Sequence, residues 1–428
     1  AGPRHSLGDL GVSAWTLVAL LGAVAVALLC ARLPTRARWL APVLQTLVAV
    51  GIALAVLAQL PTHAVAANLA VPGLGRLALT RLTAAVLVGS WAAALLELGS
   101  AARRQPSGAA AAVQILVGVG CSAVLALTGL LPLSLVLAAV MLVVWLRWQR
   151  LAGPVLPIRS LARQAAIVLC ALLAAVALLP AQRIGAAPPA LLAMLLVGGL
   201  GGVSGLLPLS AWVGAVTRMG PAEGSLWRVW LLPLGVVTLA RVVVPAPHHL
   251  AQVLQLLLVA LGLASAIFWS GAAINAAPGS RYHRVLAADV GFMCVGIGSG
   301  DLIGFAGALL LVLVHWLAGA ALSEPQAARS HLLAWVGVSG VPPFGGFSGR
   351  LLVLVGSSFM GPLVLSGVVL AFGLQLVACG LGIGEAVRRG SVRGPALSEL
   401  LGLGAAVATL AMGIFAQPLL RFAFGISL

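Results

Sequence analysis

The chain has 428 residues, of which 62% are apolar and 7% are charged, and its formal net charge is +16. Charged residues make up about a quarter of an ordinary soluble protein, so this composition excludes a soluble fold and indicates an integral membrane protein. The positive charge is spread over short connections between apolar stretches, which argues against nucleic-acid binding. No segment shows the residue alternation of an outer-membrane barrel, so we predict an all-α protein with helical spans.

About fourteen apolar stretches have roughly the 20 residues that a transmembrane helix needs. They cover 12–33, 39–60, 78–99, 109–127, 130–148, 162–180, 189–215, 225–244, 250–273, 284–299, 302–322, 331–357, 361–386 and 397–420. The polar joints between them are short, and no soluble domain is visible. Any redox centre or catalytic site must therefore belong to another chain, and we predict no cofactor, metal or catalytic residue in this one.

The arginines give the orientation of the chain. All 24 basic residues are arginine, because the sequence contains no lysine. Seventeen of them, including Arg228, Arg281 and Arg284, lie in joints that follow odd-numbered stretches, six lie on the other side, and Arg350 lies inside the twelfth stretch. Because positive charge is retained on the cytoplasmic side, we predict a multi-pass protein of the bacterial inner (plasma) membrane with both termini on the non-cytoplasmic side.

A group of arginines surrounds the end of the fifth stretch: Arg147, Arg150, Arg159 and Arg163. Clustered cationic side chains beside a membrane helix are typical of contacts with anionic headgroups. We predict that they contact phospholipid or form a docking face for a cytoplasmic subunit.

The cysteines and one histidine pair do not have the spacing of a metal site. The five cysteines stand singly in apolar stretches, at Cys30, Cys121, Cys170, Cys294 and Cys379. We expect buried thiols that form neither disulfides nor metal sites. His248 and His249 are adjacent on a loop, and two such histidines rarely bind a metal alone.

Two stretches break the helical pattern in a related way. Glycines run into Pro208 in the seventh stretch, and into Pro342 and Pro343 in the twelfth. Proline removes an amide donor and frees carbonyls that must find other partners. Two interrupted helices five spans apart are typical of inverted-repeat transporters. We therefore predict two five-helix repeats, formed by spans 4–8 and 9–13, and divide the chain into 1–108, 109–244, 245–386 and 387–428; ordinary proline kinks are the alternative.

The same two stretches resemble a known family. Gly340–Arg350, with the sequence GVPPFGGFSGR, resembles the G-[IV]-P-P-x-x-G-F-x-G-K element on the broken twelfth helix of the antiporter-like subunits of respiratory complex I. PLSAW at Pro208–Trp212, followed by Pro221, resembles the family's element around the seventh helix. The joint RYHRVLA and the helix VLVHWLAGAAL, which contain His283 and His315, are also similar to family elements. The family includes Mrp-type antiporters and membrane-bound hydrogenase subunits.

The resemblance implies a central row of ionisable residues, from which this chain departs. In the family a glutamate on the fifth span, lysines on the seventh and eighth, and a lysine or glutamate on the twelfth form the row. Here the first three positions fall near Ala138, on Val203, and on Pro233 or Leu234, and only Arg350 stays basic. Arginine keeps its charge even when buried, so Arg350 can hold a carboxylate in place and is a poor proton carrier.

The remaining candidates for a proton or ion pathway are His315, Asp289, Arg350 and His283. A charge at membrane depth is costly and should face the protein interior. His315 is either a proton carrier or a neutral histidine bonded to a carbonyl freed by the broken twelfth span. Asp289 either pairs with Arg350 or His315, or is exposed to solvent near the membrane–water interface. The predicted elements of the breaks are Pro208, Trp212, Pro342, Pro343 and Gly346.

Three functions fit these observations. The first is a membrane subunit of a complex I-like assembly that takes part in proton or cation translocation coupled to a partner's chemistry. The second, nearly equal to it, is a scaffold subunit that docks neighbouring membrane subunits and passes no protons. A stand-alone secondary transporter comes third, because the chain offers few charged groups for a binding cavity. The predicted partners are other membrane subunits, a cytoplasmic catalytic subunit and phospholipid.

Overall fold

The computed structural model describes most of the chain. The described residues are 21–32, 40–57, 69–71, 75–77, 81–101, 108–126, 130–152, 166–175, 177–178, 188–210, 212–214, 221–244, 246–322, 328–388 and 396–424. The chain divides into two compact units, Ala1–Arg147 and Trp148–Leu428.

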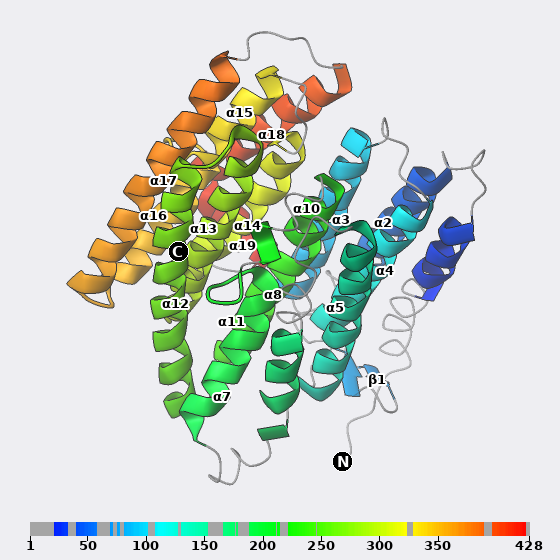
Figure 1. The fold of residues 1–428 in the computed structure, drawn as a ribbon, viewed down its shortest axis with the longest axis horizontal. Coiled ribbons are helices and arrows are strands. Elements are labelled where there is room, and N and C mark those ends of the chain that lie inside the picture. The colour runs from blue at the N-terminus through cyan, green and yellow to red at the C-terminus, as the bar shows by residue number, and fades with distance from the viewer. Residues whose placement is uncertain are drawn as a thin grey trace. The chain divides into compact units, whose positions relative to one another are not determined.

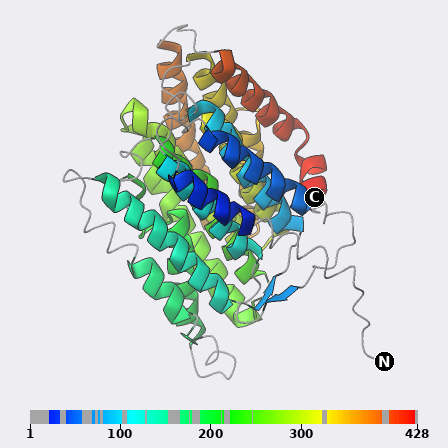
Figure 2. The ribbon, with the colours of Figure 1, turned by 90° about the vertical axis from the view of Figure 1, so that its right-hand side faces the viewer.

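The first unit consists of helices and one short hairpin. Its helices are Leu21–Arg32, α2 (Leu40–Leu57), α3 (Arg81–Ala101), α4 (Gly108–Ala126) and most of α5 (Leu130–Ala152). Strands β1 (Leu69–Val71) and β2 (Gly75–Leu77) form a two-stranded hairpin (Figure 2). They pair antiparallel, with Ala70 opposite Arg76. The sequence did not predict this hairpin, which lies between the second and third apolar stretches.

The second unit contains the remaining helices. They are Ala166–Ala175, α7 (Pro189–Leu196), η4 (Val197–Gly201), α8 (Gly202–Ser204), α10 (Pro221–Leu226), η5 (Trp227–Leu231), α11 (Leu232–Val243), α12 (His248–Ile274), α13 (Pro278–Gly298), α14 (Leu302–Leu322), α15 (Ala328–Val338), α16 (Gly345–Ser358), α17 (Pro362–Arg388), α18 (Ala396–Ile414) and α19 (Ala416–Phe424). In this unit α12 packs against α13 and α17, and α14 packs against α13 and α16 (Figure 1).

The fold is that of an all-α polytopic membrane protein, as the composition predicts. Each predicted apolar stretch contains a helix in its described part. Four described helices are long and apolar enough to cross a membrane: Gly224–Val243, His248–Ile274, Leu302–Gly319 and Pro362–Arg388.

Both predicted helix breaks are present. The helix that starts at α7 ends at Ser204, and α15 ends at Val338 before α16 resumes at Gly345. Each break starts with a glycine at positive φ, Gly205 at 92° and Gly340 at 78°, a conformation that glycine adopts without steric cost. The Leu207–Pro208 and Pro342–Pro343 peptide bonds are both cis. The two breaks thus share a backbone path as well as a Val-Ser-Gly sequence.

Two π-helical segments, η4 and η5, were not predicted. Each has five residues and lies in the helix before or after the first break. A π-helical turn shifts the faces on which the following side chains lie, and such turns are frequent at functional sites. Here η5 contains Trp227 and Arg228, both of which are buried.

Glycines allow the helices of the second unit to approach backbone to backbone. A Cβ at Gly262 of α12 would lie 2.7 Å from the carbonyl oxygen of Gly291 on α13. A Cβ at Gly307 of α14 would lie 2.6 Å from the carbonyl oxygen of Gly349 on α16. Such small-residue contacts let membrane helices gain packing and bring their polar groups within reach of each other.

We expect Gly413→Ala to destabilise the protein. A Cβ at Gly413 of α18 would collide with the carbonyl oxygen of Pro343 in the second break, which is backbone and cannot move aside alone. The expected loss of unfolding free energy is about 1–3 kcal/mol, the usual cost of overpacking. Gly404→Ala on the same helix is the control, because nothing lies within 4 Å of its Cβ position. Thermal unfolding in detergent should show a lower midpoint for Gly413→Ala only.

The prediction for the cysteines is correct at four positions and wrong at one. All five are free; Cys30, Cys121, Cys294 and Cys379 are buried, whereas Cys170 is exposed. Cys170 lies on the outer face of the helix Ala166–Ala175. A thiol behaves as a small apolar group, so an outward position in an apolar helix costs little.

Candidate functional site

The second helix break is held by the side chain of Arg350. This residue lies in the second turn of α16 and is 1% exposed. Its Nη1 donates to the carbonyl oxygens of Val338, at 2.7 Å, and Gly346, at 3.3 Å. Arg350 therefore satisfies a carbonyl that the end of α15 leaves open. Gly346 has to be small, because its Cβ would lie 2.7 Å from the carbonyl oxygens of Gly337 and Val338.

Asp289 of α13 is the counter-ion of Arg350. Nε of Arg350 donates to Oδ1 at 2.9 Å, and Nη2 donates to Oδ2 at 2.7 Å. The side chain of Asp289 is 0% exposed, so the alternative of a wet position near the interface is wrong. A two-point contact between guanidinium and carboxylate fixes both groups in orientation. The predicted pairing with Arg350 is confirmed, and Asp289 also bonds His315.

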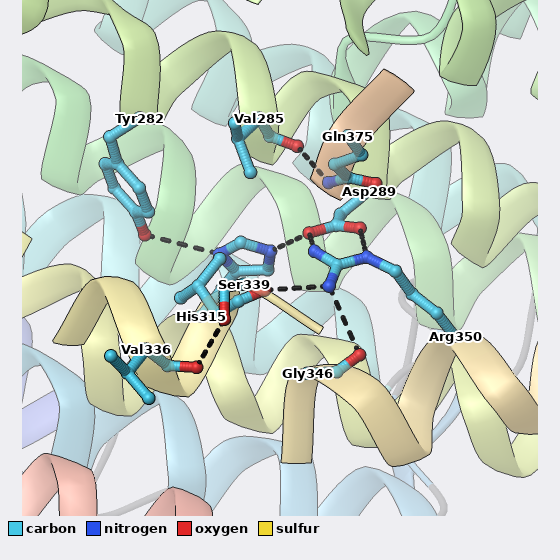
Figure 3. Close-up of polar contacts among 10 residues, drawn as sticks. Tyr282, Val285, Asp289, His315, Val336, Ser339, Gly346, Arg350 and Gln375 are labelled. Carbon is cyan, nitrogen blue, oxygen red and sulfur yellow. Dashed lines mark hydrogen bonds and ion pairs between the residues drawn. The ribbon is translucent and has the colours of Figure 1, made fainter. Parts of the chain in front are cut away.

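His315 of α14 joins Asp289 to Tyr282. Its Nε2 lies 2.6 Å from Oδ2 of Asp289, and its Nδ1 lies 3.3 Å from the hydroxyl of Tyr282 (Figure 3). His315 is 1% exposed. The alternative in which His315 bonds a carbonyl of the broken span is wrong, because both ring nitrogens contact side chains. The row Tyr282–His315–Asp289–Arg350 is hereafter called the buried network.

The buried network has two protonation states in which every bond has a donor and an acceptor. With Asp289 and Arg350 charged, a neutral His315 donates from Nε2 to the carboxylate and accepts the Tyr282 hydroxyl at Nδ1. A proton added at Nδ1 produces an imidazolium, and the Tyr282 oxygen then accepts the bond. His315 can therefore hold one extra proton while both of its ring nitrogens stay bonded, and the hydrogen of the Tyr282 hydroxyl then has no acceptor among the described residues.

Two further basic side chains lie beside the network. Arg228 of η5 is 1% exposed, and its Cζ lies 5.9 Å from the centre of the Tyr282 ring. It packs on Gly319 of α14, where a Cβ would collide with it. His283 is 7% exposed, its ring lies against Gly224, and neither ring nitrogen has a hydrogen-bond partner among the described residues. His283 is thus adjacent to Tyr282 but outside the hydrogen-bonded row.

Two arginines that entered the orientation count are not surface residues of joints. Arg228 is buried in η5, and Arg281, in the first turns of α13, is 5% exposed. Arg281 pairs with Glu385 of α17 and donates to the carbonyl oxygens of Ala273 and Ala276. It therefore caps the end of α12 inside the protein. Both arginines therefore lie in buried parts of helices and not in exposed joints.

The first helix break is held by neutral donors. Trp212 donates from Nε1 to the carbonyl oxygen of Gly202 at 3.1 Å, and Trp227 donates to that of Ser204 at 3.0 Å. Val203, at the family's lysine position, is 0% exposed. Trp212, predicted as a break element, thus has an identified contact, whereas Pro208, like Pro342 and Pro343, is exposed.

Sequence reasoning missed several members of the site. Tyr282 is the only tyrosine of the chain, and Arg228 interrupts an apolar stretch. Both features are visible in the sequence and could have marked these residues as candidates. Trp227 gave no signal, because its partner lies across the fold. Gln375 of α17, which is fully buried and donates to the carbonyl oxygen of Val285 at 3.2 Å, was missed for the same reason.

No protein-family model matches the sequence, and no curated protein matches it either. Solved structures do match. A chain of the Mrp complex from Dietzia sp. DQ12-45-1b is 17% identical, with a TM-score of 0.77 over 96% of this chain and 52% of that chain. A chain of respiratory complex I from Thermus thermophilus is 18% identical, with a TM-score of 0.76 over 95% of this chain and 97% of that one.

A chain of the membrane-bound sulfane sulfur reductase, an archaeal respiratory membrane complex, is 16% identical, with a TM-score of 0.76 over 98% of this chain and 96% of that chain. The chain thus spans about half the length of the Mrp chain and nearly all of the other two. The class is therefore defined by the fold: a polytopic membrane protein built like the membrane subunits of these complexes. The predicted resemblance is confirmed at the level of the fold over nearly the whole chain.

Proposed function

We propose that this chain is a membrane subunit of a multisubunit assembly of the complex I or Mrp kind, and that it takes part in proton translocation through the buried network. The observation that carries the proposal is the bond of 2.6 Å between His315 and Asp289, both fully buried, beside the break that Arg350 holds. In this proposal partner subunits supply the driving chemistry.

The physical argument rests on what each group can do with a proton. His315 can take up and release one near neutral pH in ordinary surroundings, which no arginine does. Tyr282 can donate to His315 or accept from it, so a proton can leave on the side opposite to Asp289. Arg350 keeps Asp289 charged and aligned, and Asp289 in turn stabilises the imidazolium.

The architecture that supports this function has fourteen spans and two inverted five-helix repeats, spans 4–8 and 9–13. Shared features of the two breaks support the repeat: the Val-Ser-Gly sequence, the glycine at positive φ and the cis proline. From the excess of arginine in alternate joints we place the chain in a bacterial inner membrane with both termini on the non-cytoplasmic side. Arg147 and its neighbours in sequence then face phospholipid or a cytoplasmic subunit.

A scaffold subunit without proton transfer is the second candidate function. The apolar residues at the family's other row positions favour it, above all Val203, which is fully buried. A chain that keeps both breaks but has lost titratable groups from one of them fits a retained architecture with reduced chemistry. A stand-alone transporter is a more distant alternative.

Proton uptake by reconstituted vesicles separates these functions. The intact assembly is inserted into sealed vesicles, driven by its own substrate and followed with a pH-sensitive dye. We expect His315→Ala to lower the initial uptake rate at least about tenfold, because a positioned proton carrier is lost, and Arg350→Ala to lower it as well. His249→Ala, at an exposed position outside the network, is the control. Unchanged uptake by His315→Ala in an intact assembly would establish the scaffold role instead.

A further inference from the structure

Three tryptophan rings lie together at the first helix break. The bonds of Trp212 and Trp227 cover the carbonyl oxygens of Gly202 and Ser204 at the end of α8. The ring of Trp148 stacks on that of Trp212 with centres 5.4 Å apart, and Trp212 meets Trp227 edge to face at 5.8 Å. The carbonyls that a broken helix leaves open are thus satisfied by indole N–H groups under an apolar layer.

The three rings are buried and lie close to the break. Trp148, Trp212 and Trp227 are 3%, 4% and 0% exposed. A Cβ at Gly205 would come within 3.3 Å of the Trp227 ring, so the rings lie directly against the break. The sequence has no Asp, Glu, Lys, Arg or His from 184 to 217. The indole N–H groups occupy two carbonyl oxygens that an entering water molecule would otherwise bond, whereas the buried hydroxyl of Ser210 has no partner among the described residues.

The second break differs from the first in the group that donates to its freed carbonyl. Its freed carbonyl, that of Val338, is bonded by Arg350, which is linked through Asp289 to His315. The two breaks share the Val-Ser-Gly sequence, a glycine at positive φ and a cis proline, and they differ in the donors that bond their carbonyls. The first break has neutral donors that cannot exchange protons, and the second has a charged donor joined to a group that can.

We infer that the first helix break is a proton barrier, in which Trp148, Trp212 and Trp227 seal the membrane against leakage. An unsealed break would expose a row of carbonyls to water and offer a hydrogen-bonded path across part of the bilayer. The inference goes beyond the proposed function and does not depend on it, because a pumping subunit and a scaffold both require a membrane that holds its gradient.

Passive proton leakage tests the barrier. The intact assembly is reconstituted in sealed vesicles with a pH dye inside and no driving substrate, and the medium is acidified in one step. Trp212→Phe combined with Trp227→Phe keeps the rings but removes both indole donors. We expect leakage to rise at least about tenfold, since each of the two lost buried hydrogen bonds corresponds to a factor of about that order in a rate. Trp269→Phe is the control, because that buried indole N–H has no partner among the described residues.

A second measurement covers the case in which the double variant does not assemble. Ser204→Cys places a thiol at the break, and Cys170→Ala removes the exposed native thiol. With all tryptophans present, a small water-soluble thiol reagent should leave the introduced thiol of Ser204→Cys unmodified, and adding Trp227→Phe should allow modification. Unchanged leakage in an assembled double variant, or modification of Ser204→Cys with the tryptophans intact, would overturn the barrier. Neither measurement involves His315 or turnover. A negative result here would therefore leave the proposed function untouched, and a negative result there would leave the barrier untouched.

Discussion

Replacement of Asp289 by leucine is expected to lower the free energy of unfolding by about 3–5 kcal/mol, the cost of breaking a buried ion pair by removing one partner. Leucine fills a similar volume, so the loss comes from charge. Arg350, which is 1% exposed, would keep its charge without the carboxylate that now accepts two of its bonds. His315 would lose its Nε2 partner as well. Unfolding in mixed micelles with increasing dodecyl sulfate, followed by circular dichroism, measures the loss.

Two comparisons show whether the effect comes from the buried pair. Asp301 is a partly exposed aspartate whose Oδ2 accepts the backbone N–H of Ile303 at 3.0 Å at the start of α14. Asp301→Ala should cost only about 1 kcal/mol, the value of a helix cap. The double variant Asp289→Leu/Arg350→Leu should be less destabilised than Asp289→Leu, because no unpaired charge remains. Equal effects of Asp289→Leu and Asp301→Ala would contradict the structure of the network.

The two helix breaks could be predicted because their causes are local. Proline cannot donate a backbone bond and glycine alone adopts positive φ freely, so Pro208 and Pro343, each three residues after Gly205 or Gly340, mark the breaks directly in the sequence. The helical stretches could be predicted for the same reason, because the length of an apolar run is itself the local signal for a transmembrane helix. The sequence could not show which arginines are buried, because the burial of Arg228 and Arg281 depends on the neighbouring helices.

Three members of the buried network could be predicted from the sequence for a different reason. In an apolar chain very few charged residues lie at membrane depth, and each needs a partner. Asp289, Arg350 and His315 therefore had few alternatives, although the sequence left the pairing open. The structure adds that Asp289 bonds both of the others at once. This requires α13, α14 and α16 to meet at one level, which glycine contacts such as Gly307 with Gly349 permit.

The tryptophan contacts of the first break could not be predicted. A tryptophan in a membrane sequence normally indicates an interfacial anchor, as its amphipathic ring suggests. Trp227 instead donates to a carbonyl 23 residues earlier in the chain. The direction in which the Trp227 side chain points depends on the π-helical segment η5. A π-helical turn has no clear pattern of residue types in the sequence. The chemistry of the first break therefore became visible only once the helices had been placed in space.

Replacement of Arg350 by lysine is expected to give a protein of intermediate stability, and it distinguishes charge from geometry. The resemblance to antiporter-like subunits places a lysine at this position, so Arg350→Lys also brings the chain closer to that pattern. Arg350 forms four hydrogen bonds, two to Asp289 and two to the backbone carbonyls of Val338 and Gly346. An ammonium group has three donors at one point and cannot reach both sides.

Arg350→Lys should therefore keep Asp289 compensated but leave one or two acceptors of the second break unbonded, at a cost of about 1.5–3 kcal/mol. Arg350→Leu, which removes the charge as well, should cost about 3–5 kcal/mol. The order of unfolding midpoints in mixed micelles is then parent, lysine, leucine. If the lysine variant were as unstable as the leucine variant, the fork of the guanidinium rather than its charge would be what holds Asp289 and the break together. If it matched the parent, the bonds of Arg350 to Val338 and Gly346 would contribute nothing, and the second break would have to be held by its glycine packing alone.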